Sequence, residues 1–349
     1  MFSSSFQVFL IMKKILVLGY FGFSTEQFDG QRSKTREVYR LFQEQVDGEV
    51  SYFDTECFKY NKLLVFKMFL KIAYSDTLVY LPAHNNLKYL FPFIFVISLI
   101  CRVKIHYFVI GGWLREFLKD LPFHRFLLKH VQGIYVETLC MKNELKEFYK
   151  FNNVIQFPNF RFFEYTPTLS THTQLRLVFM ARINIKKGLD WVFELASFIQ
   201  KNNLTDKYTI TFFGPINDLD RLYFEQNISK YSFVEYKGIL QPDKIHETLS
   251  QFDVLLLPTH YYTEGLPGSV VDAYISGLPV IVSEWKHATE FVEDGKSGFI
   301  VPFEDGEELF IKRVTQLEAN RDKLMSMKSY AAKKSKEFSA PELRSFLEI

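Results

Sequence analysis

Short apolar runs alternate with amphipathic segments along nearly the whole chain. The runs are rich in β-branched and aromatic residues and are bounded by polar or glycine-containing stretches, which is typical of strands. Between them apolar residues recur at helical spacing, as Leu189, Val192 and Phe193 do. The predicted strands cover residues 14–19, 49–53, 77–81, 103–110, 133–136, 154–156, 175–181, 208–213, 233–236, 253–258, 279–283 and 299–301.

Most of these runs are apolar throughout, which indicates parallel sheets covered by helices on both faces. A polar, threonine-rich stretch at 161–174 contains Pro167 and interrupts the rhythm. We therefore expect an α/β protein of two Rossmann-like, doubly wound domains that face each other across a cleft at the carboxyl ends of their strands. The expected parts are a first domain over 12–162, a linker over 163–174, a second domain over 175–325, and a C-terminal helix over 326–349 that packs back on the first domain.

The composition indicates a globular protein but does not point to a particular reaction. The 349 residues are 48% hydrophobic and 23% charged, which is typical of a globular chain large enough for two domains. A formal net charge of +2 gives no reason to expect nucleic-acid binding. Cys57, Cys101 and Cys140 are widely spaced and form no disulfide framework, which fits a reducing compartment and predicts a cytoplasmic protein.

Three segments bear on export and membranes. Residues 1–11 have no basic region and too short an apolar run for a signal peptide, and the strand-like sequence begins at Met12. Residues 89–101 are apolar but number only thirteen, against the roughly 20 that a membrane-spanning helix needs, so we expect a buried helix. Residues 59–71 mix four lysines with Phe and Leu. They predict either a plain packed helix or a basic apolar face that contacts the inner face of a membrane.

The sharpest chemical signal lies at residues 263–283, TEGLPGSVVDAYISGLPVIVS, which follow a predicted strand and lead into a helix. Backbone N–H groups at this helix start would form an anion site suited to a diphosphate. Glu264 and Asp272, eight residues apart, could accept hydrogen bonds from sugar and ribose hydroxyls. A purely structural interpretation also exists, because Ser269 and Asp272 match a capping box. Gly277 is likewise typical of a helix end.

A second signal follows the strand at 175–181. Arg182 and Lys187 lie in the loop before Gly188 opens a helix, so two cations would stand at the carboxyl end of a strand. They could neutralise a diphosphate leaving group, Arg with its fork geometry and Lys as a point charge. The alternative is a solvated basic loop.

Together these residues resemble the large retaining glycosyltransferase family 4, which has the GT-B fold. The resemblance implies that Arg182 and Lys187 contact the donor diphosphate, that Glu264 lies by the donor sugar, and that position 272 binds the ribose. The family usually has Glu at that last position, and this chain has the shorter Asp272. The implied donor-binding residues are Gly188, Gly214, Leu240, Gly265, Leu266, Pro267, Gly268, Ser269 and Asp272.

The first domain should hold the acceptor. A loop at 20–31 leads into a predicted helix, and relatives often place a glycine-bearing loop here; a simple loop with a helix cap is the alternative. The P-loop spacing is absent. His106 lies inside a strand, where a core role is expected. The acceptor-side candidates are Gly30, Lys34, Thr35, His84, Gly111 and Gly112.

The resemblance implies transfer of a hexose from a nucleotide sugar, UDP favoured, to a glycan or lipid-linked acceptor with retention, in bacterial polysaccharide biosynthesis. We expect no metal or other cofactor, because Asp218 and Asp220 do not follow a strand as metal-binding carboxylates usually do and are expected to start a helix. Alternatives are a sugar phosphorylase, a nucleotide-sugar epimerase, and a catalytically silent subunit that binds a nucleotide sugar or a partner.

Overall fold

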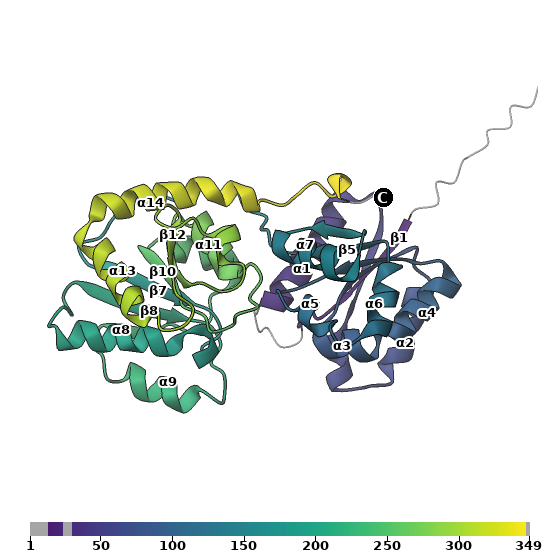
Figure 1. Ribbon diagram of the computed structural model, residues 1–349, viewed down its shortest axis with the longest axis horizontal. Coiled ribbons are helices and arrows are strands. Elements are labelled where there is room, and N and C mark those ends of the chain that lie inside the picture. The colour runs from purple at the N-terminus through teal and green to yellow at the C-terminus, as the bar shows by residue number, and fades with distance from the viewer. Residues whose placement is uncertain (1–12, 24–29, 347–349) are drawn as a thin grey trace, which may run out of the picture.

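The computed structural model describes residues 13–23 and 30–346, which form two α/β domains side by side (Figure 1). The first domain contains a six-stranded sheet in the order β2-β1-β3-β4-β5-β6, with all neighbouring strands parallel. Its strands are β1 (Lys13–Gly19), β2 (Gly48–Asp54), β3 (Thr77–Leu81), β4 (Lys104–Phe108), β5 (Gly133–Val136) and β6 (Val154–Gln156).

Alternate side chains of β1 enter two separate cores, because successive residues of a strand point to opposite faces. Ile15 and Val17 pack under α1, and Leu16 and Leu18 pack under the helices of the other face. The helices of this domain are α1 (Gly30–Gln45), α2 (Leu64–Ala73), α3 (His84–Tyr89), α4 (Phe91–Cys101), α5 (Leu114–Phe117), α6 (Pro122–Lys129) and α7 (Leu139–Tyr149), with a 3₁₀ turn η1 (Thr55–Lys59).

The second domain repeats this plan with the order β12-β11-β10-β7-β8-β9, again all parallel. Its strands are β7 (Leu175–Met180), β8 (Tyr208–Phe213), β9 (Val234–Tyr236), β10 (Val254–Leu257), β11 (Val280–Ser283) and β12 (Gly298–Val301). Its helices are α8 (Leu189–Lys201), α9 (Arg221–Ile228), α10 (Ile245–Leu249), α11 (Gly268–Ile275), α12 (Ala288–Phe291), α13 (Glu307–Ala319) and α14 (Arg321–Lys334). The 3₁₀ turns after the first domain are η2 (Ile185–Lys187), η3 (Pro242–Lys244), η4 (Ser335–Phe338) and η5 (Leu343–Ser345).

The chain crosses between the domains twice, and the two crossings run side by side. Arg161 donates its backbone N–H to the carbonyl of Phe338, 2.9 Å away, and pairs with Ser339 in a short bridge. Before this point α14 packs on α11. Beyond it Leu343 and Phe346 pack into the α1 core of the first domain.

The fold agrees closely with the sequence prediction. All twelve expected strands are present, and the two-domain, doubly wound GT-B arrangement is confirmed. Asp220 immediately precedes α9, as expected for a helix start. Residues 1–11, for which a signal peptide was not expected, lie outside the described residues.

One local prediction is wrong. Residues 89–101 do not form a fully buried helix, because one side of α4 faces solvent. The capping box, the structural alternative for residues 269–272, is absent: Pro267 precedes α11, and no side chain caps that helix. Within the described residues, no helix is both long and apolar enough to span a bilayer.

Candidate functional site

A cleft of about 1350 Å³ lies between the domains, at the carboxyl ends of strands from both sheets. This is where open α/β sheets bind ligands. Most of the residues predicted for donor and acceptor line it, and Lys34, Thr35, Gly112 and Gly188 lie just behind its wall. The predicted residues in the wall are Gly30, His84, Gly111, Arg182, Lys187, Gly214, Leu240, Glu264, Gly265, Leu266, Pro267, Gly268, Ser269 and Asp272.

Lys187 and Glu264 face each other across the second-domain side of the cleft. The Lys187 ammonium lies 2.8 and 2.7 Å from the two carboxylate oxygens of Glu264. The turn η2 holds Lys187 in place, because the Asn184 side chain accepts the Lys187 backbone N–H at 2.9 Å. Both charged side chains stay partly exposed, so a ligand that enters the cleft can reach them. Arg182 lines the same wall.

Two glycines allow the loops of this wall to come close together. Gly188 has φ +85°, and a Cβ there would overlap the carbonyl of Pro258 at the end of the neighbouring strand. Gly214 has φ +134°, and a Cβ there would overlap the carbonyl of Ala181. Gly188 therefore shapes the wall from behind, whereas Gly214 also lines the cleft.

The loop before α11 is held from both domains. Trp285 donates its indole N–H to the carbonyl of Gly265 at 3.2 Å. From the first domain, Glu137 accepts the backbone N–H of Leu266 at 3.0 Å, and Gly265 leaves room for that carboxylate. The first-turn N–H groups of α11 consequently stand at the cleft, in the position that suits an anion.

Lys34 supports the Glu137–Leu266 contact between the domains and does not line the cleft. Its ammonium lies 2.8 Å from the second carboxylate oxygen of Glu137, and both side chains are buried. Burial lowers the pKa of Lys34, and the attraction of Glu137 opposes that shift. Thr35 uses its hydroxyl within α1, donating to the carbonyl of Gln31 at 2.8 Å. The Gly112 N–H donates to the carbonyl of Thr263 at 3.0 Å.

Asp272 is engaged by Arg161, a residue that the sequence did not single out. The guanidinium donates to both carboxylate oxygens, at 2.8 and 3.0 Å, and His246 approaches at 3.3 Å. Although burial favours the neutral acid, the charge and hydrogen bonds of Arg161, with help from His246, hold the pKa of Asp272 below its ordinary value. Arg161 also lies against the start of α11, where a Cβ on Gly268 would be 2.6 Å from its Nη2.

Glu37 of α1 faces this cluster from the acceptor side. It lines the cleft, and one of its oxygens is buried without a hydrogen-bond partner among the described residues. Burial raises the pKa of Glu37, with a smaller contribution from Asp272, while Arg161 opposes the shift. His84 also lines the acceptor side, with its ring 3.6 Å from that of Trp113.

His106 is a core residue, as the strand pattern predicts. It is buried in β4, where its Nδ1 lies 2.9 Å from the Tyr135 hydroxyl. Burial, with a contribution from Lys104, lowers its pKa to about 4. The imidazole is therefore neutral at ordinary pH, and His106 is not among the residues that line the cleft.

A further contact joins the domains beside the cleft. Glu290 accepts the backbone N–H groups of Leu139 and Cys140 at 2.6 and 3.0 Å, at the start of α7. Lys286 lies 2.8 Å from Glu144 on the same helix. The potential metal ligands of Cys140, His287 and Glu290 gather within 4.8 Å, but both Glu290 oxygens are already used by these N–H groups.

Sequence reasoning missed Glu137, Arg161 and Glu37. Glu137 had a usable signal, because a carboxylate directly after a buried strand falls at the ligand-binding edge of the sheet. Arg161 lies in an irregular crossing segment, and Glu37 is one of several charged residues in α1, so no local pattern separates them from solvated side chains.

Two parallel-sheet domains with cations, a carboxylate and a helix start gathered at the cleft define the class of GT-B proteins. Known structures agree. The chain superposes on HepE from Anabaena in complex with UDP-glucose with a TM-score of 0.72, at 15% identity over 94% of this chain and 96% of that one. Sucrose-phosphate synthase from Thermosynechococcus elongatus also gives 0.72, at 12% identity over 96% of both chains. At such identities the likeness shows the fold alone.

Sequence comparison finds relatives of the second domain. Residues 164–334 match the model for glycosyl transferases group 1. The putative colanic acid biosynthesis glycosyltransferase WcaL of Salmonella typhimurium is 29% identical over 164 residues, 46% of this chain and 40% of the relative. The amylovoran biosynthesis glycosyltransferase AmsK of Erwinia amylovora is 28% identical over 156 residues, 43% and 38% respectively. The matches thus span less than half the length of these relatives.

Proposed function

We propose that this protein is a retaining, family 4-like glycosyltransferase that moves a hexose from a nucleoside diphosphate sugar to a glycan or lipid-linked acceptor in bacterial polysaccharide biosynthesis. The Lys187–Glu264 pair in the cleft wall, beside Arg182 and the start of α11, carries the proposal. The named relatives act in polysaccharide biosynthesis, which supports the same setting here. HepE was solved with UDP-glucose, so UDP is the favoured nucleotide.

The wall residues divide the work of the proposed reaction. The C1–O bond to the diphosphate breaks, and the charge that develops on the leaving oxygen is met by Lys187, Arg182 and the N–H groups of α11. Glu264 holds Lys187 in position before the donor arrives and lies by the donor sugar afterwards. The acceptor oxygen bonds to C1 on the face that the phosphate leaves, and its proton passes to that phosphate. Retention follows from this same-face approach.

The acceptor enters from the first-domain side. Gly30, His84 and Gly111 line that side without filling it. Glu37 lines it too, and one of its carboxylate oxygens has no hydrogen-bond partner among the described residues. A lipid-linked acceptor would place the protein in the cytoplasm at the inner face of a membrane.

The positive groups of the wall support transfer without a metal ion. Two side-chain cations and a helix start stand where a metal-dependent enzyme would need its ion to neutralise the diphosphate. We expect transfer to continue at full rate in the presence of EDTA. Loss of activity with EDTA that Mg²⁺ or Mn²⁺ restores would reject this part of the proposal.

Calorimetric titration with UDP, GDP and ADP tests the donor site. Lys187→Ala removes a charge-assisted contact to phosphate, which is worth about 2 kcal/mol or roughly thirtyfold in affinity. Lys186→Ala is the matched control, because this neighbouring lysine is exposed and outside the cleft wall. One nucleotide should bind wild type and Lys186→Ala alike and Lys187→Ala much more weakly. Equal binding to all three proteins would refute the assigned site.

Turnover separates the enzyme from the silent subunit. With the nucleotide sugar identified by calorimetry and a mixture of glycan acceptors, the enzyme yields a new glycoside and free nucleotide, and Glu264→Ala abolishes both. Donor binding without any product, with acceptor present, would favour the silent subunit instead.

A further inference from the structure

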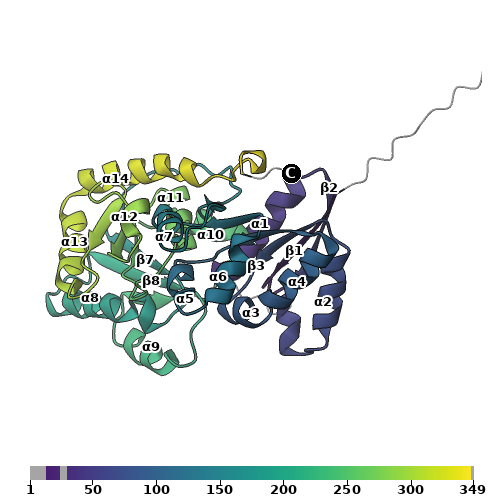
Figure 2. The same cartoon turned by 45° about the vertical axis from the view of Figure 1, so that its right-hand side comes forward.

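Three neighbouring helices of the first domain present an unusual outer surface. Helices α2, α4 and α6 lie in a row over one face of the sheet, with α4 packed against both others (Figures 1 and 2). Their inner side chains fill the core beneath. Their outer side chains, which in a soluble protein are normally polar, are largely apolar.

Helix α4 has no polar outer face. Its only hydroxyl side chain, Ser98, points inward and is 2% exposed. Four outward side chains, which are aliphatic or aromatic, are 52% to 75% exposed: Phe93, Val96, Leu99 and Ile100. The last residue of the helix, Cys101, is also exposed.

The two flanking helices extend this apolar surface. Phe66 and Leu70 of α2 are 65% and 60% exposed, and Phe123 and Phe126 of α6 are each 58% exposed. Exposed apolar side chains gathered on three packed helices indicate a binding face, because monomers ordinarily show such side chains singly.

The charged side chains of these three helices have one sign, because α2, α4 and α6 contain no Asp or Glu. Nearby carboxylates already accept backbone N–H groups. Asp76 accepts that of Lys14 at 2.8 Å, and Asp54, at the end of β2, accepts those of Phe21 and Glu56 at 3.1 and 2.9 Å. The basic residues of the three helices are Lys67, Lys71, Arg125 and Lys129. This one-sided charge fits an anionic partner and disfavours two identical copies meeting face to face.

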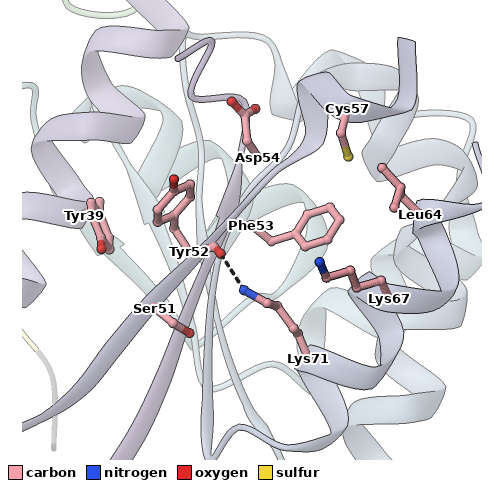
Figure 3. A pocket seen from close by; sticks show the side chains of 9 residues that line it. All are labelled: Tyr39, Ser51, Tyr52, Phe53, Asp54, Cys57, Leu64, Lys67 and Lys71. Carbon is pink, nitrogen blue, oxygen red and sulfur yellow. Dashed lines mark hydrogen bonds between the residues drawn. The ribbon is translucent and has the colours of Figure 1, made fainter. Parts of the chain in front are cut away.

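Two of these lysines border a pocket at the edge of the surface. The pocket, of about 480 Å³, lies between α2 and β2, and both Lys67 and Lys71 line it (Figure 3). Lys71 donates to the Tyr52 carbonyl at 3.1 Å, and the Lys67 side chain extends toward Phe53 (Figure 3). Phosphate oxygens of a lipid headgroup could be held by the two ammonium groups while acyl chains meet the apolar side chains.

We propose that α2, α4 and α6 seat the protein on the surface of an anionic lipid bilayer. The helices lie flat in the interface, with the apolar side chains of α4 at the centre and the lysines of α2 at the rim. Helices α4 and α6 lead back to the amino ends of β4 and β5, so their starts lie toward the carboxyl edge of the sheet, where the cleft is. This seat would bring a lipid-linked acceptor beside the cleft. The inference deepens the membrane location proposed above, but its evidence is independent of the transfer chemistry.

Vesicle flotation with the full chain tests whether this surface binds an anionic bilayer. Wild type should float with vesicles of phosphatidylcholine and phosphatidylglycerol, should not float with phosphatidylcholine alone, and should detach at high salt. Lys67→Gln with Lys71→Gln should weaken binding about 25-fold, since each lysine near an anionic surface contributes about a fivefold factor. Phe93→Ser with Ile100→Ser should weaken it about tenfold for each side chain removed.

Matched controls come from the second domain. Leu219→Ser with Leu222→Ser removes apolar side chains that are 92% and 67% exposed, and Lys201→Gln removes an exposed charge. These variants should float like wild type. Nucleotide binding is measured on every variant to show that it is folded. If wild type binds no nucleotide, that result counts against the proposed function and leaves the membrane contact to be judged by flotation.

Two results would overturn the proposed membrane contact. One is that wild type does not bind anionic vesicles, or that the Lys67 and Phe93 variants bind them as well as wild type does. The other is a dimer in analytical ultracentrifugation that Phe93→Ser with Ile100→Ser dissolves while no vesicle binding occurs, which would assign the surface to a second copy of the chain.

Discussion

The Arg161–Asp272 pair gives the most direct test of how the structure is held at its crossing point. Arg161 lies where the two crossing segments meet, and it donates twice to a carboxylate of the second domain. Asp272 is 4% exposed, so its charge depends on these bonds. Arg161→Met keeps the length and apolar stem of the side chain but leaves the Asp272 carboxylate with only the contact to His246 at 3.3 Å.

The expected loss is about 3 kcal/mol, the lower part of the range for breaking one side of a buried pair, because His246 remains. Asp272→Asn in the Arg161→Met background removes the stranded charge. The double variant should therefore recover much of the loss, and the coupling energy between the two positions should exceed about 1 kcal/mol.

Denaturant unfolding followed by circular dichroism and tryptophan fluorescence measures these values. Trp113 reports on the first domain, and Trp191 and Trp285 report on the second. The pH dependence supplies a second measurement with a definite sign. Because the folded pKa of Asp272 is lowered, its stabilisation is complete above the unfolded value of about 3.9 and is lost as pH falls through the folded value. The double variant, which has no carboxyl group at position 272, should lack this loss of stability at acid pH. An Arg161→Met protein within about 0.5 kcal/mol of wild type would refute the reasoning.

Three further outcomes follow from single positions. Gly188→Ala should lower the free energy of unfolding by about 3 kcal/mol, because φ is +85° and the new Cβ overlaps the Pro258 carbonyl; thermal unfolding at the wild-type midpoint would contradict this. Gly265→Ala should displace Glu137 and weaken nucleotide affinity, and an unchanged dissociation constant in calorimetry would speak against the role given to that contact. His106 should titrate near 4 by NMR; stability is complete above its unfolded pKa of about 6.5 and falls as pH drops toward 4, and a native midpoint near 6.5 would show that it is not buried.

The fold was predictable because its signal is local. Each strand is a short apolar run with a polar boundary, and each boundary in the structure lies within two residues of the expected one. The position of three candidate residues in the cleft wall was predictable for the same reason. Arg182, Lys187 and Glu264 lie in loops that follow parallel strands, and these loops lie at the carboxyl edge of the sheet.

The remaining parts of the site depend on pairings between distant segments. Lys34 and Glu137 are 103 residues apart, and only the folded sheet shows that their charges cancel behind the cleft wall. The outer face of α4 was missed for a related reason. An apolar run of thirteen residues reads the same whether its helix is enclosed or lies on the surface, and the position of α2 and α6 decides which.

Asp272 shows how one shorter side chain changes the chemistry of the segment at 264–272. A carboxylate one methylene longer would reach further into the cleft and offer acceptor oxygens. Here both oxygens turn to Arg161, whose guanidinium lies against Gly268 in the same wall. A ribose bound at this point would meet the N–H donors of Arg161, whose charge is balanced by the buried Asp272 carboxylate. Ribose hydroxyls could accept from these donors, because a hydroxyl accepts hydrogen bonds as well as donating them. The departure at position 272 and the arginine in the crossing segment are therefore best understood as a single unit, which neither residue reveals alone.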